Sequence, residues 1–277
     1  MSTGLLGFES VQERQGGVRE YVSASRLSCW LKCPLTWKIR YLDGVKTPTT
    51  PSLFIGKAVH AGLEGFYRHR QLGITLVPDD VAERMLQSWP RLVDEEEMTF
   101  ESTDAEQTLR QQTIDLVRSY LAHAPDNERP LAVEVAVEAP LVDPVTGEDL
   151  GMPLIGIIDL VLDYEEGPII ADFKTSGRSS EPMEVTHEIQ LTSYAYVFRH
   201  VQRWREAGLE IRSLIKTKAP KIEFHSYPAR TDVHFRRLFS VVREYLDALD
   251  SGRFNFRPGF ACGMCDFAHT HCRRWTG

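Results

Sequence analysis

The chain has 277 residues and a formal net charge of −7, and 42% of its residues are hydrophobic while 26% are charged. This balance is typical of a globular protein with a sizeable core, and the length suits one large or two ordinary domains. The negative charge argues against nonspecific coating of nucleic acid but leaves room for a local basic groove. No apolar run approaches a membrane span, and the N-terminus lacks a signal-peptide pattern, so we expect a cytoplasmic protein without membrane partners.

The first part of the chain, residues 20–130, has the spacing of apolar residues that is typical of helices. Ser23 or Ser25 is a suitable N-cap for the first of them. Predicted helices cover residues 26–42, 52–70 and 78–124, the last with a break at Trp89-Pro90.

From residue 131 the pattern changes to the alternation and β-branched runs of strands. Glu165-Glu166-Gly167 separates two of these runs and predicts a hairpin, whose second strand ends at Lys174. The order of elements predicts an α/β fold, a central mixed sheet flanked by helices. Predicted strands cover residues 131–141, 154–164, 167–174, 210–217 and 221–227, and predicted helices cover residues 185–204 and 231–252.

Two aspartates lie inside apolar runs on successive predicted strands, Asp159 in GIIDLVL and Asp172 in ADFKT. Because facing buried carboxylates repel and are costly, a divalent cation such as Mg²⁺ or Mn²⁺ between them is the economical interpretation. Lys174 shares a face with Asp172 and suits metal-assisted attack of water on a phosphodiester. From the D-x-K pattern alone, an edge-strand ion pair with a solvated Asp159 is the better interpretation, because short motifs recur by chance.

Other charged residues are weaker candidates. Glu134 and Glu138 are expected on a solvated face of their strand, and we do not place them in the site. Lys216 and Lys218 near a strand end, with Lys221 beyond, are interpreted either as phosphate contacts or as a solvated charged turn.

The five cysteines are Cys29, Cys33, Cys262, Cys265 and Cys272, three of them in the last sixteen residues. In a reducing compartment this grouping favours metal ligation over disulfides. The C-x-x-C pair directs two thiolates to one metal, Cys272 closes the set, and Cys33 is the fourth candidate. Cys29, one helical turn before Cys33, is interpreted as a small buried apolar residue rather than as a ligand.

Four motifs in order resemble the RecB-like branch of the PD-(D/E)XK nucleases, in particular its iron–sulfur members, the CRISPR-associated adaptation exonucleases and the AddB nuclease domain. The resemblance runs from SASRLSCWLKCPLTWKIRYLDG to CGMCDFAHTHC, nearly the whole chain. The matching residues are His60 in GKAVHAGLEGFY, Asp159 in GIID, Asp172 and Lys174 in DFK, and Gln190 and Tyr194 in QLTSY.

The resemblance implies a role for each of these residues. His60, Asp159 and Asp172 would bind the catalytic metal, Mg²⁺ or Mn²⁺, with the backbone carbonyl of Phe173 as a further ligand. Lys174 would position the attacking water. On one face of a helix, Gln190 and Tyr194 would hydrogen-bond the substrate backbone or support the lysine and carboxylates.

The resemblance also implies a [4Fe–4S] cluster, held by Cys33, Cys262, Cys265 and Cys272, that joins the two ends of the chain. A tie across so long a loop restricts the unfolded chain, which suits a structural role. The family usually has five residues between its last two cysteines, whereas this chain has six. His271 stands at the shorter spacing, so a zinc site or a His271 ligand competes with the cluster.

The resemblance implies one RecB-like nuclease domain over residues 1–277 with a restriction-endonuclease-like core. Its parts are a helical region (20–130), a catalytic core (131–250) and a cluster-binding tail (251–277). We expect a metal-dependent exonuclease acting on DNA ends or single strands. The alternatives are a CRISPR-adaptation nuclease that trims DNA for an integrase partner, and a non-catalytic metal-stabilised DNA-binding module. The chain has no P-loop motif, so any helicase would be a separate partner.

Overall fold

The computed structural model describes residues 17–178 and 184–277, and the polar N-terminal residues 1–16 lie outside the described part. None of the described helices is long and apolar enough to cross a bilayer. The helices are α1 (Ala24–Lys32), α2 (Pro34–Trp37), the π-helix η1 (Lys38–Leu42), α3 (Pro51–Gln71), α4 (Pro78–Glu95), α5 (Thr103–His123), α6 (Glu184–Gln202), α7 (Asp232–Ser251), the 3-10 helix η2 (Phe260–Met264) and α8 (His271–Arg274). The strands are β1 (Val22–Ser23), β2 (Pro130–Val142), β3 (Asp149–Tyr164), β4 (Gly167–Ser176), β5 (Gly208–Ile215) and β6 (Lys221–Pro228).

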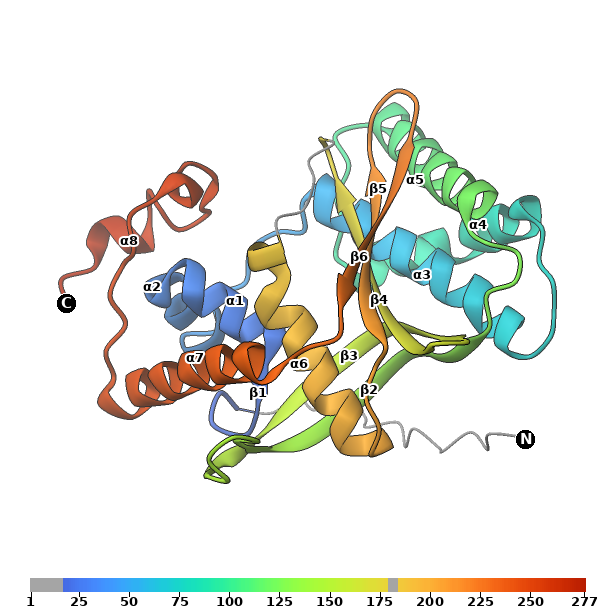
Figure 1. The fold of residues 1–277 in the computed structure, drawn as a ribbon. Helices are drawn as coiled ribbons and strands as arrows, with labels where there is room; N and C mark the ends of the chain where they lie inside the picture. The colour runs from blue at the N-terminus through green and yellow to red at the C-terminus, as the bar shows by residue number, and fades with distance from the viewer. Residues whose placement is uncertain (1–16, 179–183) are drawn as a thin grey trace.

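The strands form one sheet with the order β1-β3-β4-β5-β6, and β2 pairs with β3. The sheet is mixed, because β4 and β5 run parallel while β3 is antiparallel to β4 and β5 to β6. Helices cover both faces, α3, α4 and α5 on one and α1, α6 and α7 on the other (Figure 1). The predicted α/β class with a mixed, helix-flanked sheet is therefore confirmed.

A hydrophobic core lies on each side of the sheet. The core under α3 and α5 includes Val59, Leu63 and Phe66, the apolar stripe that the helical spacing predicts. The core under α6 and α7 includes Leu191 and Val242. The sheet is therefore buried on both faces, so a charged side chain on its central strands needs a partner.

Strand β3 loses a partner on one edge partway along its length. Strand β2 pairs along one edge of β3, so β1 and β4 both pair with the opposite edge of β3. Strand β1 pairs at Leu154 and Ile155, and the pairing with β4 stops at Leu160 and Ala171. Among the described residues, this edge is unpaired between Ile155 and Leu160. The next residues along the two strands past the last pair are Asp159 and Asp172.

Strand β2 is kinked at Glu134, which has a φ of 44°, a conformation that costs a non-glycine residue about 1–3 kcal/mol. Val133 packs into the core under α3, whereas Val135 packs into the core under α6. Their partners on β3 follow the same division: Leu160, opposite Val133, packs under α3, and Ile158, opposite Val135, packs under α6. Such irregularities re-aim side chains near functional sites.

The predicted helix over residues 26–42 is interrupted at Cys33, which has an extended backbone (φ −164°) between α1 and α2. The physical reason is Pro34, whose ring disfavours helical geometry at the residue before it. Cys33 therefore lies at a junction between helices instead of inside one.

The predicted helix break at Trp89-Pro90 is wrong, because α4 continues through Pro90 to Glu95. Trp89 is buried and packs edge-on against Phe54, with ring centroids 5.1 Å apart. Burial of this large side chain offsets the one backbone hydrogen bond that a proline removes.

Candidate metal centre and cysteine pocket

His60, Glu134 and Asp159 converge where the sheet opens. Their candidate ligand atoms all lie within 4.8 Å of one another, the one such group of histidine, cysteine or acidic side chains among the described residues. His60 comes from the middle of α3, Glu134 from the kink of β2 and Asp159 from the unpaired stretch of β3. Three elements distant in sequence thus build one candidate cation site.

The imidazole of His60 is held by a backbone group. Its Nε2 lies 3.0 Å from the carbonyl oxygen of Phe173 and must donate the hydrogen bond, because a carbonyl only accepts. Its Nδ1 faces Glu134 Oε1 at 3.5 Å and Asp159 Oδ2 at 3.6 Å. Burial opposes the charge on His60, but the Glu134 hydrogen bond and the charges of Asp159 and Asp172 outweigh it and raise its pKa to about 9.

Asp159 is buried, and its Oδ2 accepts a hydrogen bond of 2.8 Å from the backbone N–H of Phe173. Burial and then the negative charge of Asp172 raise the pKa of Asp159 to about 7, although His60 acts in the opposite direction. The raised pKa means that the protein's own positive charges compensate the negative charge of ionised Asp159 poorly.

Asp172 is 1% exposed and points toward α6. Its Oδ2 lies 2.6 Å from the ammonium of Lys174, as strand alternation predicts, and its Oδ1 accepts a hydrogen bond of 2.8 Å from Gln190. The same amide nitrogen lies 2.8 Å from the hydroxyl of Tyr194. Gln190 and Tyr194 therefore contact the site from one face of α6, but Asp172 is not part of the group formed by His60, Glu134 and Asp159.

Glu134 was expected on a solvated face, but its side chain is only 21% exposed and faces His60. The alternating pattern of its strand hides this role, because an alternating strand usually turns such a residue to water. The kink at its positive φ directs the carboxylate inward. A carboxylate beside two apolar neighbours in VEV was the only sequence signal.

The charges around this opening fit a divalent cation. Once His60 and Asp159 have given up their protons to a metal, the carboxylates of Glu134, Asp159 and Asp172 carry three negative charges against the one positive charge of Lys174. A divalent ion would balance the remaining two, and carboxylate oxygens and imidazole nitrogen are ligands that Mg²⁺ or Mn²⁺ accept. The donor set of the site therefore suits such an ion.

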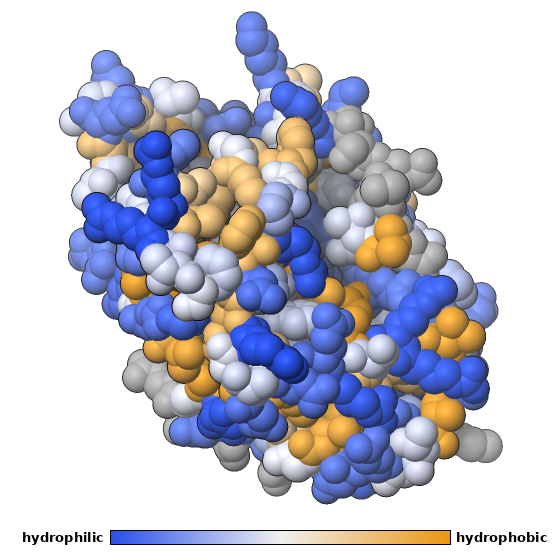
Figure 2. All heavy atoms as spheres, turned by 90° about the vertical axis from the view of Figure 1, so that its left-hand side faces the viewer, coloured by the Kyte–Doolittle hydropathy of each residue, from blue (hydrophilic) through white to orange (hydrophobic). Residues whose placement is uncertain are grey.

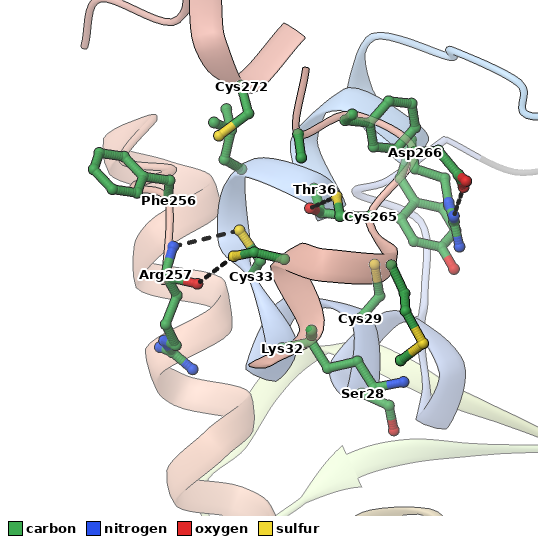
Figure 3. Close-up of a pocket in the computed structure, with 18 of the residues that line it drawn as sticks. Ser28, Cys29, Lys32, Cys33, Thr36, Phe256, Arg257, Cys265, Asp266 and Cys272 are labelled. Atoms are coloured by element: carbon green, nitrogen blue, oxygen red, sulfur yellow. Dashed lines mark hydrogen bonds and ion pairs between the residues drawn. The ribbon is translucent and has the colours of Figure 1, made fainter. Parts of the chain in front are cut away.

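A second concentration of candidate ligands lies where the two ends of the described chain meet. All five cysteines line a cavity of about 510 Å³ between the α1–α2 junction and the C-terminal segment (Figure 3). Leu35, Ile39 and Phe267 form a small core beside it. Hydrophobic packing thus joins segments more than two hundred residues apart, as the cysteine pattern predicts.

Hydrogen bonds reach the sulfur of Cys33. The backbone N–H of Arg257 donates to it at 3.4 Å (Figure 3). Burial raises the pKa of the Cys33 thiol, but hydrogen bonds from Thr36, Arg257 and Leu35 outweigh this effect and lower it. The environment of Cys33 therefore favours the thiolate, the form that binds metal.

The C-terminal segment also exposes apolar side chains. Phe260 is 93% exposed and Met264 is 77% exposed, on η2 beside the cavity. The face that carries this segment has apolar residues gathered among hydrophilic ones (Figure 2).

Comparison with known proteins agrees with this architecture. A search of curated proteins finds no match. The fold is similar to the crystal structure of a candidate exonuclease from Eubacterium rectale, with a TM-score of 0.59 and 14% identity over 94% of this chain and 90% of that one. The crystal structure of SSO0001 matches at a TM-score of 0.45 and 12% identity, over 95% and 90% of the two chains, which is too distant to support an argument. The family model of the PD-(D/E)XK nuclease superfamily matches residues 21–273, and the chain belongs to that superfamily.

Proposed function

We propose that the protein is a metal-dependent deoxyribonuclease, an exonuclease that cuts phosphodiester bonds at DNA ends or in single strands. The observation that carries the proposal is the convergence of His60, Glu134 and Asp159 on one point, next to the buried pair of Asp172 and Lys174. Membership in a nuclease superfamily supports the same reaction class.

Each side chain has a role in this proposal. His60, Glu134 and Asp159 would hold the Mg²⁺ or Mn²⁺ ion, with Asp172 and the carbonyl of Phe173 beside them. When bound, the ion would supply Lewis-acid chemistry. Lys174, held by the Asp172 carboxylate, orients the attacking water and balances charge on the phosphate. Gln190 and Tyr194 keep the Asp172 carboxylate in place, because the side-chain amide of Gln190 donates hydrogen bonds both to this carboxylate and to the Tyr194 hydroxyl.

The nuclease assay uses DNA labelled at either end, with Mn²⁺, and compares Lys174→Ala with the exposed control Lys221→Ala. We expect Lys174→Ala to lose about 10²–10⁴-fold in rate, the usual effect of removing such a group, and the control to keep its activity. Activity that survives unchanged in Lys174→Ala would reject the mechanism. A wild-type protein that binds DNA without cutting it would instead favour a non-catalytic module.

We also propose that the chain belongs to the RecB-like iron–sulfur branch, with a structural [4Fe–4S] cluster on Cys33, Cys262, Cys265 and Cys272. These four line the cavity together, whereas the imidazole of His271 packs against Phe267, with ring centroids 5.6 Å apart. This arrangement supports Cys272 over His271 as the fourth ligand.

Anaerobic purification tests the cluster. The wild type should be brown and contain iron and sulfide, Cys33→Ser should lose both, and the matched control Cys29→Ser should keep them, because Cys29 is outside the proposed ligand set. A colourless protein with stoichiometric zinc would overturn the assignment. Co-purification with an integrase or a helicase would test the expected partners and the CRISPR-adaptation role.

A further inference from the structure

A groove of about 880 Å³ adjoins the metal centre, between the first half of α3 and the end of β4. Its lining includes His60, Glu134, Ser52 and Thr175, and the charged side chains of Lys57, Glu64 and Glu96. Ser52 lies eight residues before His60, which is about 12 Å along a helix at 1.5 Å per residue. If a phosphodiester is cut at His60 and Glu134, as the proposed function holds, this groove offers a path for neighbouring nucleotides of the same strand.

The wall of the groove is unusually close to the sheet at Gly56. A Cβ atom at this position would lie 3.2 Å from the hydroxyl oxygen of Thr175, tighter than most contacts of this kind. The glycine lets α3 approach β4, so hydroxyl groups of both elements line the same groove.

Lys216 follows the end of β5 and contacts Ser52, which lines the groove. Its backbone N–H donates to the carbonyl of Ser176 at the end of β4, and its ammonium donates to the Ser52 hydroxyl at 2.7 Å. Within residues 17–178 and 184–277, it forms no ion pair, whereas Lys57 in the same groove contacts the Glu96 carboxylate. Burial lowers the pKa of Lys216, and no nearby charge adds to that effect. Because an ammonium has three N–H donors and Lys216 uses one on the neutral Ser52 hydroxyl, donors remain for an anion.

We propose that Lys216 and Ser52 form a phosphate-binding subsite for the DNA strand, about three nucleotides from the bond that is cut, at about 3.4 Å per stacked nucleotide. The ammonium neutralises one backbone phosphate and the Ser52 hydroxyl donates a further hydrogen bond. The contact is independent of base sequence, because both partners reach only the phosphate. It sets the register of the strand over the metal centre.

Salt dependence of binding measures the subsite directly. The probe is a fluorescein-labelled twelve-nucleotide thymidine strand, with fluorescence anisotropy read in Ca²⁺ over a range of NaCl concentrations. Loss of one phosphate contact should reduce the slope of log affinity against log salt by about 0.7, and by about 0.9 with a duplex of the same length. We expect this reduction for Lys216→Ala and none for the exposed control Lys218→Ala.

Lys216→Gln guards against a folding defect, because its amide keeps a hydrogen bond to Ser52 and removes only the charge. It should show the same reduced slope. An unchanged slope in both Lys216 variants, or an equal reduction in Lys218→Ala, would overturn the subsite.

A small substrate separates the subsite from the proposed chemistry. With bis(p-nitrophenyl) phosphate, which is too short to reach Lys216, Lys216→Ala should match the wild type, while its kcat/KM on the thymidine strand falls about tenfold. Equal losses on both substrates would refute the subsite. If the wild type cuts neither substrate, the nuclease proposal fails, but the salt slope still decides whether the subsite binds phosphate.

Discussion

Two groups of buried charges lie on neighbouring strands, and they are balanced differently. Arg212 of β5 is in register with Phe173 of β4, the residue whose backbone contacts both His60 and Asp159. The Arg212 guanidinium is fully buried but reaches Glu128 at 2.6 Å and Glu210 at 2.8 Å. The candidate metal centre next to it gathers more carboxylates than cations.

The Arg212 group has partners for almost every donor. Its Nη1 donates to the hydroxyls of Tyr67 and Tyr120, and the Tyr67 hydroxyl donates to Glu128 at 2.7 Å. Tyr67 lies on α3 seven residues after His60, so this network fastens the helix that carries the histidine. The comparison teaches that paired charges hold α3 in place, whereas the less compensated charges are those of the candidate cation site.

The largest expected effect concerns the balanced group. Arg212→Met removes the nearest cation from the buried Glu128 carboxylate and leaves only the Arg70 guanidinium, 3.8 Å away, so we expect a loss of about 3–5 kcal/mol in the free energy of unfolding, measured with urea. The control is Arg129→Met, because Arg129 is 76% exposed in its pair with Asp163 and should cost less than about 1 kcal/mol. Equal losses in the two variants would break the comparison.

Metal binding should depend steeply on pH. A metal ion has to displace the proton of His60, whose pKa is raised to about 9, and below about pH 7 that of Asp159 also. Each unit below a pKa costs about tenfold, so Mg²⁺ affinity should fall about a hundredfold from pH 9 to pH 7. Calorimetry in two buffers of different ionisation enthalpy would count the released protons. His60→Asn should flatten the profile, and a flat profile in the wild type would contradict this prediction.

The smallest effect has the opposite sign from that of Arg212→Met. The pKa of Asp159 is raised from 3.8 to about 7, so its contribution to stability is present below about pH 4 and is lost as pH rises through 7. Asp159→Asn imitates the protonated form. It should therefore add about 1 kcal/mol to the free energy of unfolding at pH 8 and nothing below pH 4, while nuclease activity is lost. Thermal unfolding at the two pH values measures the difference. If Asp159→Asn destabilises the protein at pH 8, the negative charge of Asp159 is already balanced by the folded protein and this prediction is wrong.

Much of the candidate site follows from local sequence. Lys174 had to share a face with Asp172, and Gln190 had to share one with Tyr194, because strand and helix periods decide such pairs. The role of Glu134 could not be predicted, because it depends on a positive φ within a strand, which the periodicity of the sequence does not reveal. The predicted helix break at Pro90 is wrong because the burial of Trp89 outweighs the local effect of the proline.

The sequence by itself determined the class of fold, the apolar faces of the helices and the types of ligand available. Only the tertiary structure decided which carboxylates meet His60 and which meet Lys174, because that depends on where β3 loses its partner and which core each strand enters. It also decided that Lys216 meets Ser52 instead of an acid. Side-chain periodicity acts over a few residues, whereas the charge balance of a site is set by segments that packing brings together across the whole chain.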